Sequence, residues 1–244
     1  MPLHDVERTG QMPERTVGIL GGMGPEATVE LFRRIIALTT AKRDQDHLHV
    51  LIDSNPKIPD RTAAILAQGE SPLPLLIAVA KNLERAGADF IIIPCNTAHY
   101  WLHELREVVS IPIIDMIGET AARVATNIPA LRTIGLLATT GTLRSNLYQR
   151  AFARSGVDLL VPSEEEDAAI MRAIHGIKAG DHTVREAVIG VAHGLVARGA
   201  EGIIPGCTEL SLVVSQDSLS VPVFDPLSIL AERAVALAMK GQEG

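Results

Sequence analysis

The chain has 244 residues, is 47% hydrophobic but only 3% aromatic, and carries a formal net charge of −7. The sequence has no cluster of Lys and Arg, which argues against a nucleic-acid partner. It also has no run of the ~18 consecutive apolar residues that a membrane span needs, which argues against a membrane partner. The length exceeds the roughly 100 to 150 residues of a typical domain, so we expect two modest domains or one unusually long α/β domain.

Short β-branched segments alternate with longer segments of helical periodicity, which is typical of parallel sheets built from βαβ units. In the first half, strands are predicted near residues 16–21, 48–53, 90–94 and 111–114. In the second half, they are predicted near residues 132–138, 157–161, 202–205 and 221–224. The pattern therefore predicts an α/β fold with two similar domains, each a mainly parallel four-stranded sheet flanked by helices.

Three segments of the first half recur in the second half in the same order. They are RTVGIL and RTIGLL (15–20 and 132–137), GADFII and GAEGII (87–92 and 199–204), and SIPIID and SVPVFD (110–115 and 220–225). We interpret these pairs as a duplicated domain, with a pseudo-twofold axis between the copies. The helix predicted after Pro226 is expected to pack back on the first half, so one domain would comprise 1–111 plus 226–244 and the other 112–225.

The loop GMGPEA (22–27) follows the first predicted strand and fits the loose G-x-G-x-x-A pattern of dinucleotide-binding proteins. Glu26, in the first turn of the following helix, would repel a pyrophosphate placed there. We therefore favour a tight turn between strand and helix over a nucleotide site.

The two cysteines occupy matching positions, each directly after a predicted buried strand, in PCNTAH (94–99) and GCTEL (206–210). The N-terminus lacks the apolar region of a signal peptide, so we expect a cytoplasmic protein in which both thiols stay reduced. Ligands of parallel sheets bind beyond the carboxyl ends of the strands. A pseudo-twofold axis would therefore place Cys95 and Cys207 on opposite walls of one cleft, each activated by the helix that begins after it.

Two thiols on opposite walls can invert a stereocentre, because one thiolate removes a proton from one face while the other thiol donates a proton to the opposite face. The alternative is that both cysteines are small buried hydrophobic residues, as free cysteine often is. The matched positions favour proton transfer.

Five motifs together resemble those of the cofactor-independent aspartate/glutamate racemases, and most closely their aspartate racemase branch. They are GGMGPEAT (21–28), NPKIPDR (55–61), PCNTAH (94–99), LATTGT (137–142) and GCTEL (206–210). The resemblance covers nearly the whole chain. It implies a homodimeric racemase of aspartate, or of glutamate or a broader set, in which Cys95 and Cys207 act without pyridoxal phosphate, metal or other cofactor.

An acidic amino acid carries a second carboxylate, for which Arg61 is the candidate partner because arginine can donate two parallel hydrogen bonds. The resemblance points to Lys178 as its companion, although a lysine at this place is also typical of a helix C-terminus. The other candidates for substrate contact lie in the loops around the predicted cleft: Met23, Asn96, Thr97, Thr139, Thr142 and Thr208. As turn and cap residues, the threonines could equally be structural.

Two neighbours of the cysteines stay open. His99 and Glu209 could each tune the adjacent thiol, or His99 could be a half-exposed helix residue. The other histidines show no metal-ligand spacing, so no metal site is predicted. Two further functions stay open: a one-base relative, such as a decarboxylase or a maleate-type isomerase, and a non-catalytic module that binds a small molecule or a nucleotide.

Overall fold

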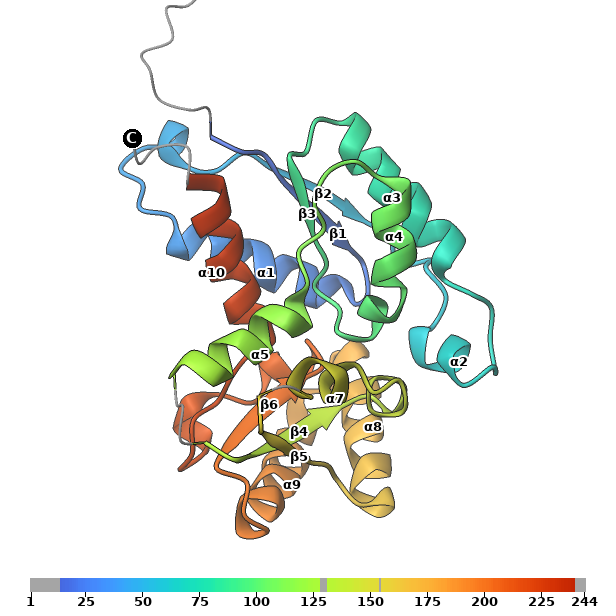
Figure 1. Cartoon of the computed structure of the whole chain (residues 1–244), viewed down its shortest axis with the longest axis vertical. Helices are drawn as coiled ribbons and strands as arrows, with labels where there is room; N and C mark the ends of the chain where they lie inside the picture. The colour runs from blue at the N-terminus through green and yellow to red at the C-terminus, as the bar shows by residue number, and fades with distance from the viewer. Residues whose placement is uncertain (1–13, 128–130, 154, 240–244) are drawn as a thin grey trace, which may run out of the picture.

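The structure, a computed structural model, describes residues 14–127, 131–153 and 155–239. Two parallel three-stranded sheets, each flanked by helices, lie one above the other (Figure 1). The first sheet has the order β2-β1-β3 and the second the order β5-β4-β6, so the two sheets repeat one topology. The predicted α/β fold of two similar halves is confirmed.

The first half supplies three strands: β1 (Val17–Gly21), β2 (Val50–Ser54) and β3 (Phe90–Ile92). Its helices are α1 (Pro25–Leu38), α2 (Arg61–Ile65), α3 (Leu73–Arg85), α4 (Leu102–Val108) and α5 (Met116–Asn127). Pro25 occupies the start of α1, and the Asp60 carboxylate accepts a hydrogen bond of 2.7 Å from the Ala63 N–H to cap α2.

The second half supplies β4 (Thr133–Ala138), β5 (Asp158–Leu160) and β6 (Gly202–Gly206). Its helices are α6 (Thr140–Arg144), α7 (Leu147–Phe152), α8 (Glu164–Lys178), α9 (Arg185–Ala197) and α10 (Pro226–Met239). Ser163 and Glu166 form a capping box at the start of α8.

The predicted fourth strand of each sheet is reduced to a single bridge in the structure, at Ile113 beside Ile91 and at Val223 beside Ile203. Pro112 and Pro222 stand in these segments, and proline has no N–H to continue a ladder. Helices α5 and α10 also begin within a few residues, which leaves no room for a longer strand.

The last helix of each half, α5 or α10, packs against the sheet of the other half. Helix α5 packs Ile117 and Val124 into the core of the second sheet, whereas α10 packs Leu227 and Leu230 against β1 and β3 of the first. Figure 1 shows α10 beside α1 and α5 at the junction of the halves. The domain boundaries at 112 and 226 stay a prediction, and residues 1–13 and 240–244 of that assignment lie outside the described residues.

Gly22 is held where the backbone of two loops meets. Its φ is +95°, and a Cβ there would lie 2.4 Å from the Asn55 carbonyl carbon. Gly87 has nearly the same φ, +96°, but nothing within 4 Å of an added Cβ. We expect Gly22→Ala to lower the free energy of unfolding by about 2 kcal/mol more than Gly87→Ala, because only the first adds a clash to the shared backbone strain. Urea denaturation of both variants measures this, and equal losses would contradict it.

Candidate active site

A small cavity of about 10 Å³ lies between the carboxyl ends of the two sheets. Both halves line it, with residues that directly follow β1, β3, β4 and β6. The lining residues are Met23, Asp60, Arg61, Thr62, Cys95, Asn96, Thr97, Thr139, Lys178, Cys207, Thr208 and Glu209. Every predicted site residue except Thr142 is therefore a wall of one cavity.

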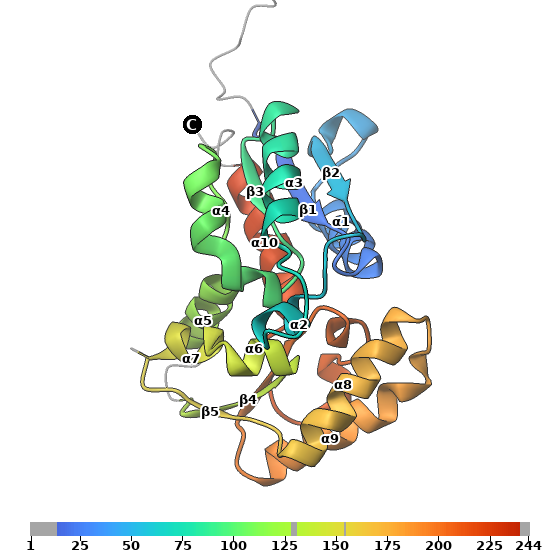
Figure 2. The same ribbon diagram turned by 90° about the vertical axis from the view of Figure 1, so that its right-hand side faces the viewer.

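Helices α2 and α6 contact each other beside this cavity, one from each half (Figure 2). A larger hollow of about 460 Å³ adjoins the cavity and shares Asp60, Arg61, Lys178 and Glu209 with it. Its other walls come mainly from the loop before α1 and from residues 56–58. The hollow therefore lies against the part of the cavity wall that carries the charged side chains.

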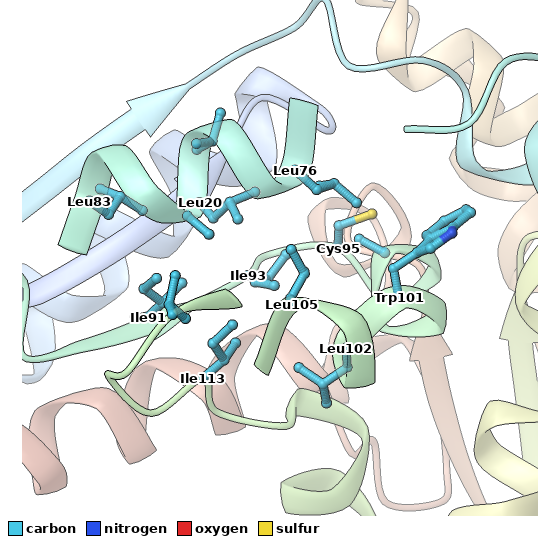
Figure 3. Packing of buried hydrophobic residues seen from close by; sticks show 14 of the residues in the cluster. Leu20, Leu76, Leu83, Ile91, Ile93, Cys95, Trp101, Leu102, Leu105 and Ile113 are labelled. Atoms are coloured by element: carbon cyan, nitrogen blue, oxygen red, sulfur yellow. The ribbon is translucent and has the colours of Figure 1, made fainter. Parts of the chain in front are cut away.

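Cys95 lies at the end of a hydrophobic cluster beneath α3, close to Trp101 (Figure 3). Cys207 occupies the matching place at the edge of the second core, and both are free thiols with 5% of their surface exposed. Burial in aliphatic packing and contact with the cavity are thus both true of each cysteine. The packing alternative explains the burial, but it does not explain why both thiols reach the same cavity.

The chain after each cysteine forms a 3₁₀ turn, at Thr97–Trp101 and at Leu210–Leu212, where the sequence predicted the start of an α-helix. The turn after Cys95 runs directly into α4, whereas no α-helix continues the turn after Cys207, so the predicted dipole activation is weaker than expected at Cys207. Side chains must supply the remaining control of thiol ionisation.

His99 is 4% exposed, so the half-exposed alternative is wrong. Its Nε2 accepts a hydrogen bond of 3.1 Å from the Met116 N–H, which leaves the proton on Nδ1 to be donated to the Cys95 carbonyl at 2.8 Å. Burial lowers the pKa of His99, which favours the neutral ring that this arrangement needs. His99 therefore ties the backbone of Cys95 to the start of α5.

Glu209 lies directly against the second thiol. The Cys207 Sγ donates to one carboxylate oxygen at 3.0 Å, and the Gly24 N–H donates to the other at 3.0 Å. Burial, followed by the negative charge of Glu209, raises the pKa of Cys207 well above its ordinary value, while the charge of Lys178 acts in the opposite direction. Glu209 thus favours the protonated state of this thiol.

The same bond bears on the dinucleotide pattern. In the dinucleotide-binding loop, backbone N–H groups at the start of the helix receive a phosphate. Here the Gly24 N–H already donates to the Glu209 carboxylate, which is 3% exposed. A phosphate would have to displace a buried negative charge, so this loop does not suit a dinucleotide.

Arg61 is 9% exposed and is half engaged by the protein. Its Nη1 donates to the carbonyls of Ile58 and Pro59 at 3.2 and 3.0 Å, whereas its buried Nε has no partner among the described residues. One edge of the guanidinium is therefore fixed to the backbone. The Nε is the guanidinium donor that these contacts leave for a ligand carboxylate.

Lys178 reaches the cavity from the end of α8. Burial acts to lower the pKa of its ammonium group, but the negative charge of Glu209 acts in the opposite direction, and the pKa is raised overall. The side chain therefore stays protonated. Together with Arg61 it gives the cavity wall two cations, which face the two carboxylates of Asp60 and Glu209.

Three threonine hydroxyls join the halves. Thr97 Oγ1 lies 3.0 Å from the hydroxyls of both Thr139 and Thr142. Thr139 also accepts from the Thr142 N–H at 3.1 Å and so caps α6, as its sequence position suggested. Thr142 is fully buried behind the cavity wall, so it supports the other two and does not line the cavity itself.

Two further structural findings concern classes of site. Within the described ranges, no group of three or more His, Cys, Asp and Glu side chains is arranged to hold a metal ion. No helix in the described part of the chain is long and apolar enough to cross a membrane.

The fold and the cavity define a two-sheet α/β protein whose central cleft receives one thiol from each half. The family model for the Asp/Glu/Hydantoin racemases matches residues 20–234, and the chain belongs to this family. The broad specificity amino-acid racemase RacX of Bacillus subtilis is 29% identical over 90% of this chain and 96% of its own length.

Solved structures agree with this family. An aspartate racemase from Picrophilus torridus superimposes with a TM-score of 0.83 and 31% identity, covering 92% of this chain and 94% of its own. An aspartate racemase homologue from Pyrococcus horikoshii gives a TM-score of 0.73 and 28% identity, covering 92% and 99%. The expected resemblance to the aspartate/glutamate racemase family is thereby confirmed.

Glu209 offers a test of what sets the ionisation of the second thiol. We expect Glu209→Gln to lower the pKa of Cys207, because it removes a neighbouring negative charge while glutamine can still accept from Gly24. In a Cys95→Ala background Cys207 is the only cysteine, so the rate of alkylation by iodoacetamide against pH reports its pKa. An unchanged or raised pKa would show that burial alone governs this thiol.

Proposed function

We propose that the protein is a cofactor-independent racemase that interconverts L- and D-aspartate by proton transfer between Cys95 and Cys207. The observation that carries this proposal is the single cavity lined by both thiols, each delivered by the end of a corresponding strand. Membership of the racemase family and the likeness to an aspartate racemase structure support it.

In the proposed reaction, one thiolate removes the α-proton from one face of the amino acid, and the C–H electron pair remains on Cα. The opposite thiol then donates its proton to the other face, so that one S–H bond forms and the other breaks. After one turnover the protonation states of Cys95 and Cys207 are exchanged, and the product enantiomer is the substrate of the reverse reaction.

Negative charge spreads from Cα onto the α-carboxylate as the proton leaves. Hydrogen-bond donors aimed at that carboxylate stabilise the transition state most when they are held in place before the reaction. Asn96 and Thr208 flank the thiols and line the cavity. We assign the Asn96 amide to this carboxylate, because the Thr208 hydroxyl already donates to the Pro94 carbonyl at 3.2 Å. Thr97 and Thr139 complete this wall through their shared hydroxyl contact.

The side-chain carboxylate of aspartate is assigned to Arg61 and Lys178. The free edge of the Arg61 guanidinium suits a two-point contact, and the raised pKa of Lys178 keeps a second positive charge beside it. Met23 borders the same cavity as an apolar wall. Glutamate and other amino acids are variants of this proposal, since a relative over nearly the whole chain is a broad specificity racemase.

Two rival functions make different demands on the site. A one-base decarboxylase or isomerase of the same superfamily would need only one of the two thiols. A nucleotide-binding module would need the Gly24 N–H that Glu209 occupies. We also propose a homodimer, on the resemblance to dimeric relatives, and light scattering measures it.

The test is incubation of the purified protein with L-aspartate in deuterated water, with EDTA and without pyridoxal phosphate. We expect deuterium to replace the α-proton in the NMR spectrum while D-aspartate accumulates to an equal share on chiral chromatography. A parallel panel of L- and D-amino acids defines the specificity. Formation of β-alanine, by loss of the α-carboxylate, or of alanine, by loss of the side-chain carboxylate, would indicate decarboxylation. The absence of both exchange and D-aspartate would overturn the proposal.

A further inference from the structure

The amide of Asn96 is held at one end only. The side chain is 2% exposed and lines the cavity. Its Oδ1 accepts a hydrogen bond of 2.6 Å from the hydroxyl of Tyr148, whereas its buried Nδ2 has no partner within the described part of the chain. A buried amide N–H₂ without a partner is unusual, because such groups are costly to leave unpaired.

An asparagine side chain can present either end by rotating half a turn, and the two ends have opposite hydrogen-bonding character. A carboxylate in the cavity needs the N–H₂ end, since an amide oxygen would repel it. What fixes the rotation is therefore as important to the site as the amide itself.

Tyr148 is suited to fix it. The residue is fully buried in α7, within the hydrophobic cluster that packs α5 against the second sheet, so its ring has little freedom. Burial raises the pKa of Tyr148 well above its ordinary value, and the hydroxyl thus keeps its proton. A neutral hydroxyl can donate to Oδ1 and hold that end of the amide away from the cavity.

We infer that Tyr148 is a positioning residue, which orients the Asn96 amide so that its N–H₂ group faces the α-carboxylate of the substrate. The inference rests on the proposed function, because it assigns that carboxylate to Asn96. Tyr148 comes from the second half and Asn96 from the first, so this bond also couples the carboxylate donor on one wall to the packing of the other.

A double-mutant cycle tests the inference. We expect Tyr148→Phe to lower kcat/KM for L-aspartate about tenfold, the scale of one misplaced buried hydrogen bond. Asn96→Ala should lower it about 100-fold, as loss of a donor to developing charge does. In the Asn96→Ala background, Tyr148→Phe should cost less than twofold, because Tyr148 acts only through that amide.

The chain offers a matched control, since Tyr100 is its one other tyrosine and its side chain is 44% exposed. Tyr100→Phe should leave kcat/KM unchanged. Thermal unfolding of each variant separates a structural loss from a positioning effect, because a purely structural role would lower the unfolding midpoint and cost the same factor in both backgrounds. That result, or a Tyr148→Phe variant with full activity, would overturn the inference.

Binding supplies a second measurement. With both cysteines replaced by alanine, calorimetric titration with L-aspartate should show weaker binding for Tyr148→Phe, and no further weakening when Asn96→Ala is already present. If the aspartate titrations showed this coupling while the protein with both cysteines intact had no racemase activity, only the proposed reaction would be refuted. Racemase activity with independent effects of the two substitutions would refute only the role of Tyr148.

Discussion

Alanine at either Cys95 or Cys207 will abolish the interconversion of L- and D-aspartate, with a loss of about 1,000-fold or more in kcat. The physical reason is that inversion needs a proton acceptor on one face of Cα and a donor on the other, and the cavity receives one thiol from each half. Chiral chromatography of the product measures the loss. Full activity in both variants would show that the cysteines are packing residues.

The two single variants should also differ from each other in a defined way. The remaining thiol can still remove a proton from its own face and return one there, so each variant should exchange the α-proton of one enantiomer without inverting it. The Cys95→Ala and Cys207→Ala variants must then act on opposite enantiomers. Deuterium incorporation into L- and D-aspartate, measured separately, checks this, and exchange of the same enantiomer by both variants would contradict opposed thiols.

Replacement of Arg61 by methionine should lower kcat/KM for aspartate about 100-fold, which corresponds to about 3 kcal/mol for a lost two-point ion pair. Arg61→Lys should restore only part of the loss, because an ammonium group keeps the charge but not the planar fork. The steady-state kinetics of both variants measure these effects.

A comparison of aspartate with asparagine as substrates distinguishes a contact with the side-chain carboxylate from a contact with the α-carboxylate. Arg61→Met should reduce any activity on asparagine far less than activity on aspartate, since asparagine lacks the second carboxylate. Lys57→Met is the matched control, because it also removes a cation. Lys57 is exposed, precedes α2 by a few residues and does not line the cavity. An equal loss on aspartate and asparagine would place Arg61 elsewhere in the mechanism.

Much of the fold could be predicted because local patterns carry it. Alternating β-branched and helical segments located the six strands that the described residues form, and the repeated hexamers identified the two similar halves. The fourth strand predicted for each half is only a single bridge in the structure, because Pro112 and Pro222 interrupt the ladder within an otherwise apolar segment.

Candidate site residues were predictable where they directly follow strands. Three of them, Cys95, Asn96 and Thr97, follow β3 in succession. Cys207, Thr208 and Glu209 occupy the corresponding positions after β6. Lys178 and Arg61 depended on the family resemblance, because a lone cation on a helix has no local feature that separates binding from solvation.

What the sequence determined by itself is the repeated strand-to-cysteine unit, whose placement at the end of a strand is set by residues close along the chain. Only the tertiary structure decided which groups meet across the cleft: the contact of Glu209 with Gly24 spans 185 positions, and that of Tyr148 with Asn96 spans 52. No signal in the sequence identified Tyr148, since its helix resembles any other buried one. Such contacts depend on how two folded halves close on each other, which no local periodicity records.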